Sequence, residues 1–321
     1  MNPLAGTYGG WLVALFVETL LYGMGVLQAY TYFARLPTDP AYIKITVLGV
    51  LLLETIQMIF FFFLSYDRFV NRFGELQLEL IWADPLQLLA AYLGAFVVQI
   101  YFAHRIHRLT KGRRKFSISA FGVYIIFAFA FVSIVAGIAQ AVTSYRLRSY
   151  LKLDQTKFIT TLQAASSLAC DILITVYLCV FLSHQKGEFM RTNSMMDSLI
   201  HDAINRGILT ALSSALNMIL FLALPGTFWF FLGLAPSSKL YMNSMLATLN
   251  GREARRAKMA SMDKGWNSIQ MAAVPAGVGA VQVQVQVQVQ TNEILNRPVG
   301  FDSNPVDMSG NLKGSELPEF V

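Results

Sequence analysis

The stretch 202–252 decides the fold and reads DAINRGILTALSSALNMILFLALPGTFWFFLGLAPSSKLYMNSMLATLNGR. It contains two apolar segments, 203–224 and 227–249, which are separated only by Pro225-Gly226. Each segment is about long enough to cross the ~30 Å hydrocarbon core of a bilayer, and Pro-Gly between them predicts a tight turn at a membrane face. Lys239 lies near the middle of the second segment. Because a lysine is costly in lipid, we expect it to face protein or water and to have an acidic partner.

The whole chain has the composition of a membrane protein. Of its 321 residues, 55% are hydrophobic and 14% are charged, whereas a soluble domain has about 25% charged residues. Seven apolar runs can be marked, at 9–33, 43–66, 85–103, 117–143, 158–183, 203–224 and 227–249. We therefore expect an all-α, seven-transmembrane helix bundle over residues 1–252, in an integral multi-pass protein. The sequence does not distinguish the plasma membrane from an internal one.

The distribution of Lys and Arg between the connections predicts the orientation. The connections that follow the first, third and fifth runs, together with the start of the tail, hold sixteen basic residues, against six in the opposite set. Basic residues favour the cytosol, so the amino terminus should lie outside and the tail inside. Trp11, Trp82 and Trp229 fall at the expected outer ends, where an indole can lie among lipid headgroups.

After residue 252 the composition changes, and we expect a disordered cytosolic tail over residues 253–321. Arg252, Arg255, Arg256 and Lys258 form a basic cluster beside the membrane that should favour anionic cytosolic lipids. Residues 281–290 are a strict Val-Gln alternation, which we interpret as a repeat expansion in coil. The net charge of +6 does not indicate nucleic acid, because the basic residues lie between apolar runs.

Ionisable residues recur near the middle of the expected spans. They are Glu18, Glu54 and Asp171, together with Lys239, and the polar residues Gln57 and Asn217 lie at similar depth. Such residues mark a ligand, proton or ion site by default and usually pair with one another. They can equally be structural, holding helices together by hydrogen bonds. Both interpretations stay open at this point.

Other chemistry has little support in the sequence. His104 and His107 lie on one helix face, but no carboxylate or cysteine completes a metal-ligand set with them, and we expect no metal and no cofactor. Cys170 and Cys179 fall on opposite faces of one helix and cannot bridge each other. We find no phosphate-binding loop, zinc-protease helix or nucleophile elbow, which argues modestly against an enzyme.

Two motifs resemble a known family. Residues 203–210 read AINRGILT and residues 239–252 read KLYMNSMLATLNGR. They are similar to the fungal multi-span membrane proteins that carry domain of unknown function 6534, most clearly over residues 158–252. The resemblance implies a seven-span protein with a variable cytosolic tail. It assigns neither an activity nor a functional residue. On physical grounds we expect the motif residues Asn205, Arg206, Tyr241, Asn243, Asn250 and Arg252 to lock the last two helices together, with Asn205 near Asn250.

Three functions fit these observations. The first is a receptor-like bundle that takes an unknown small ligand and acts on a cytosolic protein, an analogy that rests on architecture. The second is a small-molecule or proton-coupled transporter or channel, in which Glu18 and Asp171 occupy corresponding positions of two repeats. The third is a membrane scaffold without a ligand, whose polar interior only holds the helices together.

Overall fold

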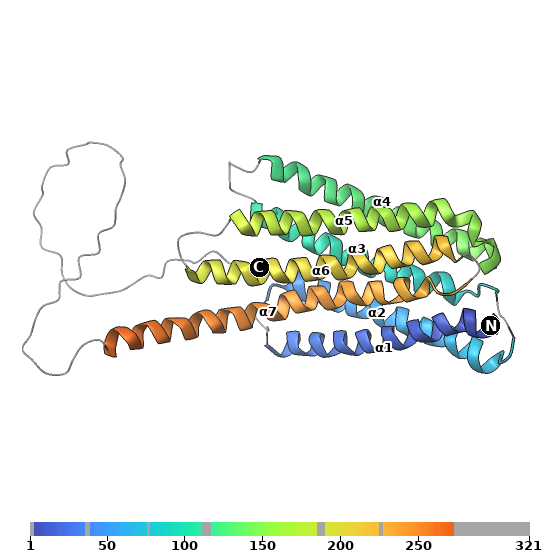
Figure 1. Cartoon of the computed structure of the whole chain (residues 1–321), viewed down its shortest axis with the longest axis horizontal. Helices are drawn as coiled ribbons and strands as arrows, with labels where there is room; N and C mark the ends of the chain where they lie inside the picture. The colour runs from blue at the N-terminus through green and yellow to red at the C-terminus, as the bar shows by residue number, and fades with distance from the viewer. Residues whose placement is uncertain are drawn as a thin grey trace, which may run out of the picture. The chain divides into compact units, whose positions relative to one another are not determined.

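The computed structural model describes residues 3–35, 39–75, 78–110, 117–184, 190–224 and 227–272, and these form an all-α bundle (Figure 1). Within these ranges lie seven long helices: α1 (Pro3–Arg35), α2 (Ala41–Tyr66), α3 (Ala83–Thr110), α4 (Ser117–Leu147), α5 (Lys157–His184), α6 (Met190–Ala223) and α7 (Phe231–Ala272). A π-helical turn, η1 (Asp67–Asn71), follows α2, and a 3-10 segment, η3 (Tyr150–Thr156), precedes α5. The predicted all-α bundle of seven long helices is confirmed within these ranges.

Consecutive helices run in alternating directions along the bundle, as Figure 1 shows for residues 1–262. Each of α1 to α5 packs against the next helix in the chain, and α3 also packs against α5. We call the end where α1 begins the upper end and the end where α1 finishes the lower end. The upper end carries η1, η3 and the connection between α6 and α7.

Within the described residues, α1 to α6 are long and apolar enough to cross a membrane, which makes the protein an integral multi-pass membrane protein. Their outward faces carry large apolar side chains, among them Phe16, Leu27, Ile45, Leu52 and Leu212. Exposed apolar surface of this extent is typical of lipid-facing helices. The bundle therefore contacts the lipid bilayer.

Helix α7 is not among these six candidates, and its surroundings explain why. Its side chains bond to α1 through Asn243, to α2 through Lys239 and to α5 through Tyr241. On another side, the Cβ that Gly233 lacks would lie 2.3 Å from the backbone nitrogen of Asn217 in α6. A helix enclosed by protein in this way does not need the apolar surface that a lipid-facing helix needs. The expected seventh span is thus the inner helix of the bundle.

Two expected boundaries differ from the structure. The seventh helix begins at Phe231 rather than at residue 227, because residues 227–230 form turns after the Pro-Gly connection. It also continues to Ala272, so residues 253–272 of the tail expected to be disordered are helical, and the rest of that tail lies outside the described residues. Residues 253–272 are rich in Ala, Arg, Lys and Met, which have high helix propensity. The Val-Gln repeat at 281–290 lies outside the described residues.

An aromatic core closes the upper end. Trp11 is fully buried there and donates its indole N–H to Ser65 Oγ at 2.8 Å, so its predicted headgroup position is wrong. Its ring lies 4.4 Å from that of Phe231 and 5.3 Å from that of Phe228, centroid to centroid. By contrast, Trp82 is 54% exposed.

Candidate functional site

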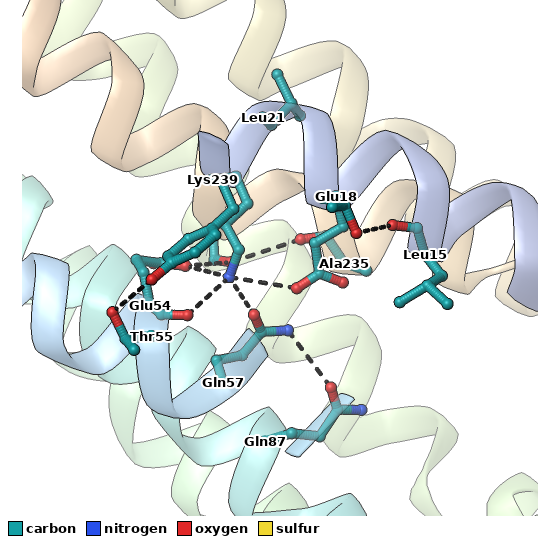
Figure 2. Close-up of polar contacts among 12 residues, drawn as sticks. Leu15, Glu18, Leu21, Glu54, Thr55, Gln57, Gln87, Ala235 and Lys239 are labelled. Carbon is teal, nitrogen blue, oxygen red and sulfur yellow. Dashed lines mark hydrogen bonds and ion pairs between the residues drawn. The ribbon is translucent and has the colours of Figure 1, made fainter. Parts of the chain in front are cut away.

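Lys239 lies in a cluster of polar side chains from three helices (Figure 2). Its ammonium Nζ lies 2.6 Å from Glu54 Oε2 and donates to the Glu54 carbonyl oxygen at 3.3 Å. Nζ also donates to Gln57 Oε1, and it lies 3.2 Å from Glu18 Oε1. All four side chains are buried. The structure therefore brings together four of the six residues expected to form an intramembrane polar site.

Helix geometry explains how these side chains converge. Glu54 and Gln57 are three residues apart on α2 and so share one face, which points at α7. On the far side, Gly94 of α3 leaves room for the Glu54 carboxylate: a Cβ added at Gly94 would lie 2.7 Å from Glu54 Oε1. Glu18 reaches the cluster from α1. Each group thus comes from a rigid helix rather than from a loop.

The two carboxyl groups are held differently. Glu54 Oε2 accepts hydrogen bonds from Lys239 and from Ser238 Oγ, the latter at 3.0 Å. Neither oxygen of Glu18 accepts a hydrogen bond within the described part of the chain. Glu54 is therefore the main partner of the ammonium. Glu18 is a second carboxyl group beside an ammonium that Glu54 already neutralises.

The cluster connects to a cavity near the upper end. Gln57 Nε2 donates to Gln87 Oε1 at 3.4 Å, and Gln87 lines a cavity of about 40 Å³ between α3, α4, α5, α6 and α7. Its other polar lining residues include Asp84, Tyr92, Gln140, Ser144, Tyr150, Thr160 and Asn217. A site of this size and polarity can hold a few water molecules.

A second cavity, of about 20 Å³, continues the first one deeper into the bundle. The two share the lining residues Tyr92, Leu234 and Asn217, and the second also touches Ser167 and Tyr241. Asn217 was expected beside Lys239, but the structure places it in the walls of these cavities. A line of polar side chains therefore runs from the upper end towards the middle of the bundle.

Asp171 belongs to a separate cluster at the end of this line. It accepts a hydrogen bond from Tyr241 Oη at 2.5 Å, and Tyr241 Oη lies 3.0 Å from Ser167 Oγ. Arg206 of α6 is also buried, and its guanidinium lies 3.8 Å from the ring centroid of Phe102. The hydrogen-bond partner of Asp171 on α7 is thus Tyr241 and not Lys239.

The expected lock between Asn205 and Asn250 is wrong. Asn205 is exposed and bonds to His201 Nδ1 of its own helix at 2.8 Å. Asn250 Nδ2 donates instead to the Gln28 carbonyl of α1, at 2.8 Å, and Asn243 Nδ2 donates to the Leu21 carbonyl of α1 at the same distance.

Arg252 follows the same pattern, because it pairs with Asp39 in the connection between α1 and α2. The motif residues Asn243, Asn250 and Arg252 of α7 therefore fasten that helix to the beginning of the chain. Of the expected lipid-contacting basic cluster, Arg255, Arg256 and Lys258 lie on α7, but their side chains are outside the described ones.

A buried ion pair at the upper end was not expected from the sequence. Arg68 Nη2 lies 3.1 Å from Asp84 Oδ1, Tyr150 Oη donates to the same oxygen at 2.6 Å, and the guanidinium lies 4.3 Å from the ring centroid of Trp11. Burial, together with the negative charge of Asp84, raises the pKa of Tyr150 well above its usual value. In the sequence, Arg68 and Asp84 are simply two opposite charges at the ends of neighbouring apolar runs. Charged residues are common at such ends, so the pair does not stand out.

The comparison with protein families gives one result. Residues 167–254 match the model of a family described as "Family of unknown function (DUF6534)", which agrees with the resemblance over residues 158–252. The match covers α5 from its middle, α6 and the first part of α7, and so includes Asp171, Arg206 and Lys239. Neither the curated proteins nor the solved structures contain a match to this chain.

Proposed function

We propose that the chain is a receptor-like membrane protein in which a small ligand occupies the upper cavity and acts on α7. The observation that carries the proposal is the position of Gln87. It lines the cavity and also accepts a hydrogen bond from Gln57, which in turn accepts one from Lys239. A ligand that competes for Gln87 therefore changes the polar environment of the ammonium on α7.

The mixed lining of the cavity suggests the class of ligand. Amide and hydroxyl groups alternate there with aromatic and aliphatic side chains such as Phe221 and Phe231. Ligand pockets are typically apolar, with a small number of polar groups that fix orientation. In the present conformation the cavity has room for only a few water-sized groups, so a larger ligand requires movement of α7 or its neighbours.

The orientation expected from the basic connections completes this proposal. It places the upper end outside and the lower end of α7 in the cytosol, with all seven helices crossing the bilayer. The continuation of α7 beyond Arg252 would then offer a helical surface to a cytosolic protein, beside anionic lipids that its basic residues favour. Binding at the cavity would reach that surface along a single helix.

A tethered occupant tests the proposal without a known ligand. In a background with Cys170→Ala and Cys179→Ala, Ser144→Cys places a thiol in the cavity wall, and ethyl methanethiosulfonate adds a small group to it. We expect the label to change hydrogen exchange of residues 239–252, and to change it less when Gln87→Leu is also present. The matched control is Tyr145→Cys, because the adjacent Tyr145 is exposed on the outer face of α4. Unchanged exchange on labelling at Ser144→Cys would contradict the proposal.

Proton-coupled transport is the second candidate, and the charge balance at Lys239 favours it. Glu18 and Glu54 share one ammonium, so the cluster has a place for one further proton. Asp171 is a third buried carboxyl group, and its partner Tyr241 lines the second cavity.

Proteoliposomes with a trapped pH-sensitive dye test this alternative. Dissipation of an imposed pH gradient by the wild-type protein, slowed by both Glu18→Gln and Asp171→Asn, would support transport. Equal leakage from wild-type, variant and protein-free vesicles would contradict it. If the tethered occupant also leaves α7 unchanged, the polar interior is structural and the scaffold function is the one supported.

A further inference from the structure

A groove on the outer face of the bundle lies between the start of α2 and the lower half of α3. It has a volume of about 940 Å³ and is separate from the polar clusters and cavities of the interior. Its walls include Tyr42 of α2 and residues of α3 from Phe96 to Arg108. The twelve helical steps from Phe96 to Arg108 give it a length of about 18 Å along the axis of α3.

The groove faces the membrane rather than the protein interior. The side of α3 packed into the bundle carries Val98, Gln99, Phe102 and Ile106, which are all buried. The groove residues occupy the other side of the same helix, and His104 and Arg108 are exposed. Because α2 and α3 are both candidate membrane spans, lipid is the medium that surrounds this face.

The chemistry of the groove changes along its length. The half nearer the middle of the membrane is apolar and is formed by Phe96, Val97 and Ile100. The half at the lower end carries His104 and Arg108. No carboxylate is among the lining residues that the structure describes. The groove is thus apolar where acyl chains lie and basic where headgroups lie.

Tyr42 organises the basic half. Arg108 Nη1 donates a hydrogen bond to Tyr42 Oη at 2.5 Å, and the Tyr42 ring meets the His104 ring edge to face, with 5.9 Å between the centroids. These contacts join α2 to α3 and hold the guanidinium at the mouth of the groove. One bond from Arg108 leaves the other guanidinium N–H groups available to a phosphate, which arginine binds through several parallel hydrogen bonds.

We infer that this groove binds one anionic phospholipid, with its phosphate at Arg108 and His104 and one acyl chain along Phe96, Val97 and Ile100. Basic sites between membrane helices bind lipid headgroups in this manner. Three features favour this occupant over a soluble anion or a second copy of the chain. They are the lipid-facing position, the apolar half at acyl-chain depth and the positive charge at headgroup depth.

The test measures binding of a defined lipid to the intact protein. Wild-type protein is purified in detergent, exchanged into phosphatidylcholine nanodiscs with or without phosphatidylserine, and assayed for retained phosphatidylserine and for thermal stability. We expect phosphatidylserine to be retained and to raise the melting temperature. Arg108→Gln should weaken its binding about fivefold, the effect of one charge near a membrane surface.

Two further variants keep the result interpretable. Ile100→Trp should obstruct the apolar half without a change of charge and weaken retention as well. Arg146→Gln removes an exposed arginine from the upper end of α4 and should have no effect. Stability in phosphatidylcholine alone verifies that each variant is folded.

Four outcomes would overturn the inference. They are equal retention by wild-type and Arg108→Gln, retention unaffected by Ile100→Trp, the same stabilisation by inorganic phosphate without phosphatidylserine, and a dimer that excludes the lipid.

Discussion

Removal of the Lys239 ammonium and removal of the Glu18 carboxylate should have very different costs. The methionine of Lys239→Met has nearly the volume of lysine, so it leaves Glu54 and Glu18 buried without a counter-charge. Glu54 Oε2 then loses a partner at 2.6 Å and keeps only Ser238 at 3.0 Å. Breaking a buried pair by removing one partner costs about 3–5 kcal/mol.

Glu18→Gln removes a group that is held much less firmly. Its Oε1 lies 3.2 Å from Lys239 Nζ, but neither oxygen accepts a hydrogen bond within the described chain. The variant leaves one carboxylate and one ammonium, which is a balanced pair. We therefore expect a loss smaller than the ~1 kcal/mol of one ordinary hydrogen bond, or a gain in stability.

Thermal unfolding in detergent at neutral pH measures this difference. At about 2–4 °C per kcal/mol, Lys239→Met should lower the melting temperature by roughly 10 °C, and Glu18→Gln should change it by a few degrees at most. Lys239→Met combined with Glu54→Gln should be more stable than Lys239→Met alone, because the second change removes the orphaned charge. Lys152→Met, at an exposed lysine of η3, is the matched control.

The reasoning would be refuted if Glu18→Gln destabilised the protein as much as Lys239→Met does. Such a result would mean that Glu18 rather than Glu54 is the main partner of the ammonium. An absence of rescue in the double variant would contradict the view that unpaired charge causes the loss.

Three further predictions concern other contacts of the bundle, each measured by thermal unfolding. Gly233→Ala should destabilise the protein severely, because its new Cβ would lie 2.3 Å from the backbone nitrogen of Asn217; unaltered stability would contradict the close packing of α6 on α7. Wild type should lose stability above about pH 10 faster than Tyr150→Phe, because a pKa raised above the usual 10.0 in the folded state makes stability fall as pH rises past that value. Only the neutral Tyr150 hydroxyl can donate its proton to Asp84, so identical pH profiles of wild type and Tyr150→Phe would argue against this hydrogen bond. Asn250→Ala should cost about 1 kcal/mol by removing one hydrogen bond to α1, and a neutral result would show that this bond contributes nothing.

The sequence predicted the helices and the need for a partner at Lys239, because both follow from the cost of polar groups in hydrocarbon. It could not predict which acidic residues form ion pairs with Lys239. Sequence position fixes the depth of a residue in a span, whereas its direction around the helix axis depends on how the helices pack. Glu18, Glu54 and Asp171 share a similar depth, but only the first two face Lys239.

The ion pair of Arg68 with Asp84 illustrates a different gap. Charged residues at span ends are normally hydrated, so nothing in the sequence distinguishes a buried arginine from an exposed one there. Burial of Arg68 depends on the ring of Trp11, whose centroid lies 4.3 Å from the guanidinium. Trp11 belongs to α1 and is far from Arg68 in the sequence. The same contact explains why Trp11 lies in the core and not among headgroups.

Helix α7 contributes side chains to both buried polar clusters, which explains why it is less apolar than the other helices. Lys239 and Tyr241 are two residues apart and so project about 200° apart around the helix. One side chain therefore faces Glu54 on α2, and the other faces Asp171 on α5. Rotation of α7 about its axis would break bonds in both clusters together, so neither cluster can change alone. A ligand at Gln87 or a proton at Glu18 would act on the same rigid element, so either of the two proposed functions would operate through α7.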